Sequence, residues 1–258
     1  MDWKKYFSLE NEQPLDRFVE GISNTAIFRK IAFVGDSLSS GEFESCDENG
    51  DHGWHDYFEY SWGQYIARKN GLTAYNFSKG GMRADTYIKS FAEGKDFWNK
   101  ELACQAYVIA LGVNDILNAR QELGSIADIK ENWQDNAETF AGYFAAIVQR
   151  YKEIQPRAKF FFVTMPKGID EGRNALAAQH AKLLYDLADY FENAYVIDLN
   201  KYAPVYDEEF RRRYFLYGHM NASGYIFTAN MIDSYIDYIV RHNPEDFSRV
   251  GFIGTDLK

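Results

Sequence analysis

The chain has 258 residues, with 28 Lys or Arg against 38 Asp or Glu, and a formal net charge of −10 at pH 7. This length suits one sizeable α/β domain, and a second independent domain would have to be small. The acidic balance lacks the clustered positive charge that nucleic acid or an anionic membrane surface requires, so we expect no nucleic-acid partner and no membrane partner.

The two cysteines and the first residues of the chain indicate whether the protein holds a structural metal and where in the cell it is located. Cys46 and Cys104 are too few for a disulfide framework and wrongly spaced for structural zinc, which predicts two free thiols. Residues 1–6 have mixed charge without the apolar core of a signal peptide, and no run of about 18 apolar residues would span a bilayer. We expect a cytoplasmic protein without a cofactor or metal.

Short apolar runs alternate along the chain with segments of helical period, which is typical of parallel strands joined by crossover helices. The expected strands are residues 30–35, 73–77, 106–111, 159–165 and 194–199. The expected helices lie at about 56–70, 83–98, 132–154, 172–192 and 222–242. The pattern predicts one α/β domain over residues 1–258, with its core at about 28–242. The tail, residues 243–258, either packs back or remains mobile.

Two polar segments stand out between these elements. Residues 39–56 form the longest irregular stretch, and we expect them to build part of the rim of a site. Within this stretch, His52 and His55 could be metal ligands, although a polar loop is the favoured interpretation. The basic cluster at residues 211–213 follows three acidic residues and is interpreted as a solvated helix face.

Polar or glycine residues follow the first three expected strands. Ser37 comes after the first strand, Gly81 after the second and Asn114 after the third. Because the carboxyl ends of parallel strands meet at one edge of an open sheet, these residues are expected to lie together. The sequence therefore predicts a site at this edge.

Four blocks in this order resemble the conserved blocks of the GDSL or SGNH hydrolase superfamily. They are Gly35-Asp36-Ser37-Leu38, Asn76-Phe77-Ser78-Lys79-Gly80-Gly81, Gly112-Val113-Asn114-Asp115 and Gly218-His219-Met220-Asn221. The resemblance covers about residues 30 to 240. It implies a three-layer α/β/α sandwich of flavodoxin-like type with a central five-stranded parallel sheet.

The resemblance also implies roles for individual residues. Ser37 would be the nucleophile and, through its backbone N–H, one oxyanion donor, whereas an isolated serine here would be a turn or N-cap residue. Gly81, rather than Gly80, would be the second donor, and Gly80 could be a loop glycine with positive φ. Asn114 would donate through its amide, unless it merely forms a turn. His219 would be the general base.

One position departs from the family pattern. Leu216 stands three residues before His219, where the family usually has an aspartate that orients the imidazole. A backbone carbonyl near residues 215–217 could replace it, or a carboxylate from elsewhere, with the nearest upstream candidates at Asp207, Glu208 and Glu209. Alternatively, the protein has lost fast catalysis and kept a binding pocket.

The leading interpretation is a serine esterase, a carboxylic ester hydrolase acting on a small-molecule or oligosaccharide ester. Residues 39–62 mix polar and aromatic side chains that suit a sugar face, which favours O-acetyl groups on carbohydrate. The alternatives are a lysophospholipase or thioesterase for longer acyl chains, a weakly active or non-catalytic ligand-binding protein on the same scaffold, and metal-assisted deacetylation through His52 and His55.

Overall fold

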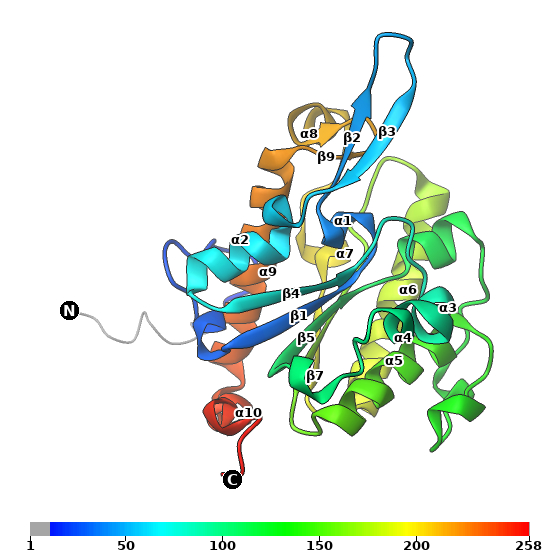
Figure 1. Cartoon of the computed structure of the whole chain (residues 1–258). Coiled ribbons are helices and arrows are strands. Elements are labelled where there is room, and N and C mark those ends of the chain that lie inside the picture. Colours follow the sequence, from blue (N-terminus) through cyan, green and yellow to red (C-terminus); the bar gives the residue numbers. More distant parts are fainter. Residues whose placement is uncertain (1–10, 258) are drawn as a thin grey trace.

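The computed structural model describes residues 11–257, and its centre is a parallel sheet of five strands (Figure 1). The strands are β1 (Lys30–Gly35), β4 (Thr73–Ser78), β5 (Ala106–Ala110), β6 (Lys159–Val163) and β7 (Ala194–Ile197). Their order in the sheet is β4-β1-β5-β6-β7, and every neighbouring pair is parallel. Counted along the chain this is the 2-1-3-4-5 order of flavodoxin-like folds, as predicted.

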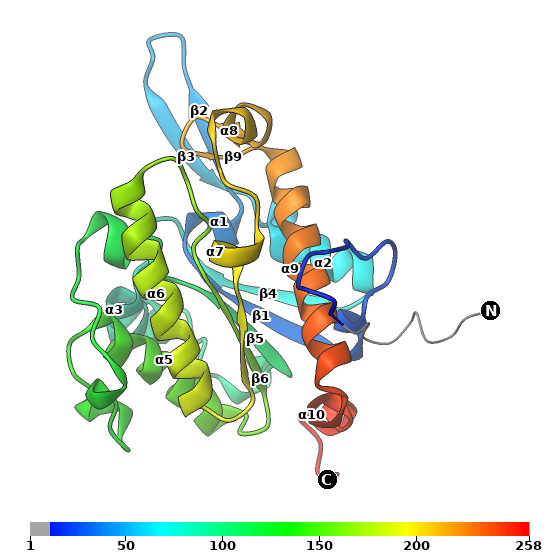
Figure 2. The same cartoon turned by 180° about the vertical axis from the view of Figure 1, so that it is seen from behind.

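Helices cover both faces of the sheet (Figures 1 and 2). One face carries α2 (Trp62–Asn70) and α9 (Ala222–His242). The other carries α3 (Ala84–Thr86), α4 (Ala92–Gly94), α5 (Phe140–Ile154) and α6 (Glu171–Tyr190). The three-layer α/β/α sandwich is therefore confirmed.

The two layers of core follow from the alternation of side chains along each strand. In β1, Ala32 and Val34 pack with α5 and α6, whereas Ile31 and Phe33 pack with α2 and α9. All four side chains are fully buried, which explains why the strand is apolar without interruption.

Two helices begin later than their periodicity predicts, because a capping side chain sets the first turn. Ser61 accepts a hydrogen bond from the backbone N–H of Gln64, so α2 starts at Trp62. Thr139 caps α5 in the same way.

The segment predicted as one helix over residues 83–98 is divided into α3, a π-helical stretch and α4. The remaining short stretches are 3-10 turns at Asn24–Ile27, Phe58–Tyr60, Lys100–Leu102, Ile126–Asp128, Trp133–Asp135 and Val250–Phe252, and π-helical turns at Tyr87–Phe91 and Val113–Asn118.

The prediction that residues 39–56 are irregular is wrong. After α1 (Ser37–Ser40) they form an antiparallel hairpin of β2 (Glu42–Cys46) and β3 (His52–Asp56), which projects beyond the sheet (Figure 1). Asp47 accepts hydrogen bonds from the backbone N–H groups of Asn49 and Asp51 and thereby closes the connection. The hairpin has polar side chains on both faces, which is why its pattern resembles a loop.

The last part of the chain contains α7 (Leu199–Tyr202), α8 (Glu208–Tyr214), β8 (Phe215–Leu216), β9 (His219–Met220) and α10 (Pro244–Phe247). The three arginines at residues 211–213 are exposed on α8, as predicted. The tail packs back onto the domain, since Phe247, Val250 and Ile253 are buried against the face that carries α9.

Two further expectations concern the thiols and the membrane. Cys46 and Cys104 are free cysteines, as predicted. Across residues 11–257, no helix has both the length and the apolar character to cross a bilayer. Residues 1–6, on which the expectation about a signal peptide rests, lie outside the described part, and the cytoplasmic location stays a prediction.

Candidate active site

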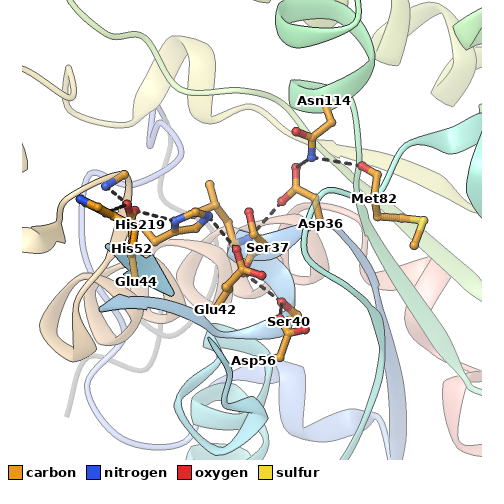
Figure 3. A network of polar contacts seen from close by, with 12 residues as sticks. Asp36, Ser37, Ser40, Glu42, Glu44, His52, Asp56, Met82, Asn114 and His219 are labelled. Carbon is orange, nitrogen blue, oxygen red and sulfur yellow. Dashed lines mark hydrogen bonds and ion pairs between the residues drawn. The ribbon is translucent and has the colours of Figure 1, made fainter. Parts of the chain in front are cut away.

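The carboxyl ends of β1, β4 and β5 open into a pocket of about 880 Å³. Ser37, Gly81, Asn114 and His219 all line it, so the four residues that the sequence singled out are brought to one place. Figure 3 shows how Ser37, Asn114 and His219 lie around Asp36 and Glu42. The geometry around each of these residues decides what the pocket can do.

Ser37 is the first residue of α1, directly after the turn that ends β1. The N-cap is Asp36, whose Oδ1 accepts a hydrogen bond of 3.1 Å from the backbone N–H of Leu38. Ser37 is therefore not the capping serine that the alternative interpretation required. A Cβ at Gly35 would come within 2.6 Å of Ser39 Cβ and 2.9 Å of the Ala110 carbonyl oxygen, so only glycine permits this tight turn.

Gly80 and Gly81, which follow β4, have different structural roles. Gly81 has φ of +72°, a left-handed conformation that glycine adopts without strain, and a Cβ there would meet no atom within 4 Å. Gly80 is not among the glycines with positive φ, so the interpretation that it serves a left-handed turn is wrong. A Cβ at Gly80 would instead overlap the Glu42 carboxylate. The first glycine makes room for Glu42, and the second turns the backbone toward the pocket.

Asn114 connects the blocks that follow three different strands. Its Nδ2 donates to the Met82 carbonyl at 3.2 Å and lies 3.4 Å from Asp36 Oδ2 (Figure 3). Its Oδ1 accepts a hydrogen bond of 2.9 Å from Asn118 Nδ2. These contacts identify Nδ2 as the atom on the side of Met82 and Oδ1 as the atom on the side of Asn118. The neighbouring Asp115 accepts a hydrogen bond from the Ala84 N–H at 2.7 Å, and burial raises its pKa to about 7.

His180, a buried histidine that the sequence pattern did not single out, contacts Leu111 and Gly112 just before Asn114. His180 of α6 lies 3.1 Å, through Nε2, from the Leu111 carbonyl, and burial lowers its pKa to about 4. The neutral ring therefore donates from Nε2. A Cβ at Gly112, whose φ is +134°, would collide with the same ring. His180 thus positions the backbone that leads to Asn114. Its single occurrence within a helical pattern carries no signal of this role.

His219 is held between two carboxylates of the hairpin. Its Nδ1 lies 3.1 Å from Glu44 Oε2, and its Nε2 lies 3.0 Å from Glu42 Oε1 (Figure 3). Both carboxylates come from β2, two positions apart, and residues two apart on a strand share a face. Leu216 pairs with His219 across β8 and β9 and is exposed, so the carboxylate beside Nδ1 comes from the β2–β3 hairpin and not from position 216.

Glu44 is itself fixed by three donors. Besides His219, it accepts hydrogen bonds from the Gly218 N–H at 2.8 Å and, through Oε1, from His52 Nδ1 at 2.6 Å. Burial acts to raise its pKa, but the hydrogen bonds from His219, Gly218 and His52 outweigh burial and hold the pKa below its usual value. Glu44 is therefore ionised at neutral pH and faces the imidazole with a negative charge.

The three upstream acids predicted as candidates serve α8 instead, which corrects that prediction. Asp207 caps the helix by accepting from the Phe210 N–H at 2.8 Å, Glu208 lies exposed in its first turn, and Glu209 pairs with Arg213. Carboxylates at a helix N-terminus are retained there by the free N–H groups. The group at Nδ1 is also not a backbone carbonyl, since Glu44 occupies that position.

Glu42 and Asp36 line the pocket, and the pKa of each carboxyl group is raised above its usual value. Burial raises the pKa of Glu42, while the nearby His219 lowers it. Burial also raises the pKa of Asp36, to about 6. Within residues 11–257, Nε2 of His219 contacts Glu42, and no hydrogen bond joins the Ser37 side chain to the imidazole.

His52 and His55 do not face a common point. His52 contacts Glu44, and His55 contacts Ser45 Oγ at 2.9 Å. Glu44 and Ser45 are adjacent on β2, so their side chains point to opposite faces of the hairpin, and the two rings do as well. The arrangement does not support the metal-assisted alternative.

A smaller cavity of about 70 Å³ adjoins the main pocket and shares Asp36 and Leu38 with it. Its lining is largely apolar and includes Trp62, Val163 and Met220. Ser37, Gly81, Asn114 and His219 are not part of this lining.

Solved structures of esterases share the fold at low sequence identity. A family two carbohydrate esterase from Clostridium thermocellum in complex with cellohexaose has a TM-score of 0.56 at 14% identity, over 92% of this chain and 67% of that one. A carbohydrate esterase family 2 enzyme with a carbohydrate-binding domain from Corynascus thermopiles has a TM-score of 0.56 at 15% identity, over 90% and 69%. A family 3 carbohydrate esterase from Clostridium thermocellum has a TM-score of 0.53 at 16% identity, over 83% and 97%.

Sequence comparison gives the family directly. No curated protein matches the chain. The model of the GDSL-like lipase/acylhydrolase family matches residues 33–226, which begins within β1, contains Ser37, Gly81 and Asn114, and reaches beyond His219. The chain therefore belongs to the GDSL-like lipase/acylhydrolase family.

Proposed function

We propose that the protein is a serine esterase that hydrolyses short-chain carboxylic esters, with O-acetyl groups on carbohydrate as its substrates. The observation that carries this proposal is the contact between Glu44 and Nδ1 of His219. It provides the orienting carboxylate that position 216 lacks, in the same pocket that Ser37 lines. Family membership supports a hydrolase in general, and this contact supports the serine mechanism.

In the acylation step, the Ser37 hydroxyl replaces Glu42 at Nε2 of His219. Nε2 accepts the hydroxyl proton as Oγ bonds to the carbonyl carbon, and Glu44 stabilises the imidazolium through Nδ1. The negative charge on the former carbonyl oxygen is met by the N–H groups of Ser37 and Gly81 and by the Asn114 amide. The bond to the alcohol oxygen then breaks, and the alcohol leaves with the proton from Nε2.

Deacylation repeats these steps with water. His219 removes a proton from water as the water oxygen attacks the acyl carbon on Ser37. The second tetrahedral intermediate uses the same donors, and Ser37 leaves with the proton held by His219. The products are the free acid and the regenerated hydroxyl.

The acyl group and the alcohol meet different surroundings. The apolar cavity of about 70 Å³ shares Asp36 and Leu38 with the pocket that Ser37 lines, and its volume has room for an acetyl group, which favours a short acyl chain. The main pocket is much larger, at about 880 Å³, and Trp54 of the hairpin lies on its lining with 58% of its surface exposed. An exposed indole packs well against the C–H face of a sugar. The carbohydrate esterases named above support the same alcohol class.

Activity should be measured with 4-nitrophenyl acetate, 4-nitrophenyl octanoate and an acetylated xyloside, using wild type, Ser37→Ala and Ser39→Ala. Ser39 is the matched control, because it belongs to the same α1 and its buried Oγ has no hydrogen-bond partner in the described residues. We expect acetate hydrolysis that is lost in Ser37→Ala and kept in Ser39→Ala.

Two results would contradict the proposal. If octanoate were the better substrate, the acyl preference would be wrong and the long-chain alternatives would gain. If Ser37→Ala matched wild type, or if a serine-reactive phosphonate failed to label Ser37, the serine mechanism would be wrong and a binding role would replace it.

A further inference from the structure

Three basic side chains line the pocket that contains Ser37 and His219. They are Lys167 from the loop after β6, Arg173 from the first turn of α6, and Arg211 from α8. The same pocket is lined by three carboxylates, those of Asp36, Glu42 and Asp170, so what each charged group contacts decides which of them a ligand can meet. The basic cluster interpreted as a solvated helix face thus contributes one member to the pocket.

Hydrogen bonds and one stacked pair of rings join the three segments that carry these cations. Asn174 of α6 accepts from the Gly168 N–H and donates to the Gly168 carbonyl, each at 2.9 Å, which fixes the loop to the helix. The Lys167 carbonyl accepts from the Tyr206 N–H at 2.8 Å. Tyr206 stacks on Phe210 of α8 with ring centroids 4.1 Å apart. These contacts therefore fix the backbone of the three segments relative to one another, and the side chains of the three cations extend from it.

None of the three cations forms an ion pair with a carboxylate of the residues that the structure describes. Within residues 11–257, the side chains of Lys167 and Arg173 have no ion pair or hydrogen bond. In the described part of the chain, the Arg211 side chain contacts two neutral groups, the Tyr217 carbonyl at 3.4 Å and the Phe215 ring at 4.5 Å.

The carboxylates of the same pocket are already engaged. Asp36 caps α1, Glu42 pairs with His219, and Asp170 caps α6 by accepting from the Arg173 N–H at 2.7 Å. The oxygens of these carboxylates are therefore held by contacts within the protein and do not pair with Lys167, Arg173 or Arg211, whose charges remain available to a ligand.

We propose that Lys167, Arg173 and Arg211 form a subsite for an anionic group, a carboxylate or a phosphate, on the alcohol part of the ester. The inference rests on the proposed esterase function and narrows its substrate class. The acyl group is assigned to the apolar cavity, so the cations face the alcohol. Guanidinium groups bind both carboxylate and phosphate through paired N–H donors, and a lysine adds a point charge.

The test compares substrates that carry an anionic group with neutral counterparts that lack it. One pair is an O-acetylated methyl hexuronoside and its neutral methyl ester, and the other is an O-acetylated hexose 6-phosphate and the O-acetylated hexose. The variants are Lys167→Gln, Arg173→Gln and the double variant. Arg212→Gln is the control, because it removes the same charge from α8 at a residue that does not line the pocket.

The readout is the ratio of kcat/KM for the charged to the neutral member of each pair. We expect wild type to favour a charged member by about tenfold, and the double variant to bring the ratio close to one. Arg212→Gln should keep the wild-type ratio, and added salt should lower it. Preference confined to the uronate or to the phosphate would support the subsite and identify its anion. A wild-type ratio at or below one for both pairs, or an equal loss in Arg212→Gln, would overturn it.

A binding measurement separates this inference from the esterase proposal. Calorimetric titration of Ser37→Ala with the deacetylated hexuronoside, its methyl ester and the hexose 6-phosphate requires no turnover. Tighter binding of a charged sugar, weakened in the double variant, would support the subsite even if no ester were hydrolysed. Equal binding of charged and neutral sugars would contradict the subsite while leaving the serine mechanism unaffected.

Discussion

Glu44 Oε2 lies 3.1 Å from Nδ1 of His219, although the two residues are 175 positions apart in the sequence. The carboxylate comes from the hairpin that follows the nucleophile and not from the segment before the histidine. The same oxygen accepts a hydrogen bond from the Gly218 N–H, so the hairpin and the histidine turn are joined at two adjacent residues. A Cβ at Gly218 would come within 2.8 Å of this oxygen, which explains the glycine.

Replacing Glu44 by Gln should reduce kcat far more than it changes KM. The amide keeps the size of the side chain but removes the charge that stabilises the imidazolium. In serine proteases the corresponding change costs about 10⁴ in kcat, and we expect a loss of about 10² to 10⁴ here. Steady-state kinetics on 4-nitrophenyl acetate would measure it.

Glu48→Gln is the control for Glu44→Gln, because Glu48 lies exposed in the connection between β2 and β3. Comparable activity in Glu44→Gln and wild type would show that His219 needs no carboxylate at Nδ1. A loss of activity accompanied by an equal loss of thermal stability would indicate a structural role instead.

Replacing Glu42 by Ala should make Ser37 more reactive. Glu42 Oε1 lies 3.0 Å from Nε2 of His219, so it competes with the serine hydroxyl for the nitrogen that accepts the proton. Removing a competing hydrogen bond of ~0.7 kcal/mol corresponds to about threefold faster labelling by a phosphonate. The labelling rate of Glu48→Ala provides the baseline. Slower labelling in Glu42→Ala would mean that this carboxylate assists His219.

The sequence predicts the sheet closely, because its strands are buried on both faces and therefore apolar throughout. The expected strand at residues 30–35 coincides with β1. Residues at the ends of such strands meet by topology alone, which is why Ser37 and Asn114 could be placed together in advance. The hairpin could not be predicted in this way. Its strands are polar on both faces, and the contact of Glu44 with His219 depends on tertiary packing that no local pattern encodes.

Trp54→Ala should weaken discrimination between a sugar ester and a simple aryl ester. The indole is exposed on the pocket lining, where it can pack against a sugar ring. Loss of such a contact is worth about 0.5–1.5 kcal/mol, or roughly 2- to 12-fold. The measurement is the ratio of kcat/KM for an acetylated disaccharide to that for 4-nitrophenyl acetate. His55→Ala, on the opposite face of the same strand, should leave the ratio unchanged. A ratio that is equal in wild type and Trp54→Ala would remove the argument for a sugar from this residue.

Asp36→Asn should change how stability depends on pH. Burial raises the pKa of Asp36 from 3.8 to about 6, so between these values the folded state binds more protons than the unfolded state. Stability therefore falls as pH rises through this window, and the full cost is present above it. A shift of about two units corresponds to ~3 kcal/mol.

The asparagine variant has no such titration while its side-chain oxygen can still accept from the Leu38 N–H. Urea unfolding at pH 4, 5, 6 and 7 should thus show Asp36→Asn gaining up to ~3 kcal/mol relative to wild type as pH rises. Asp51→Asn, at an exposed position of the hairpin, controls for a change in net charge. Parallel pH profiles for wild type and Asp36→Asn would show that the carboxylate is ionised without cost. In that case the Asn114 amide beside Asp36 Oδ2 would stabilise the charge despite burial.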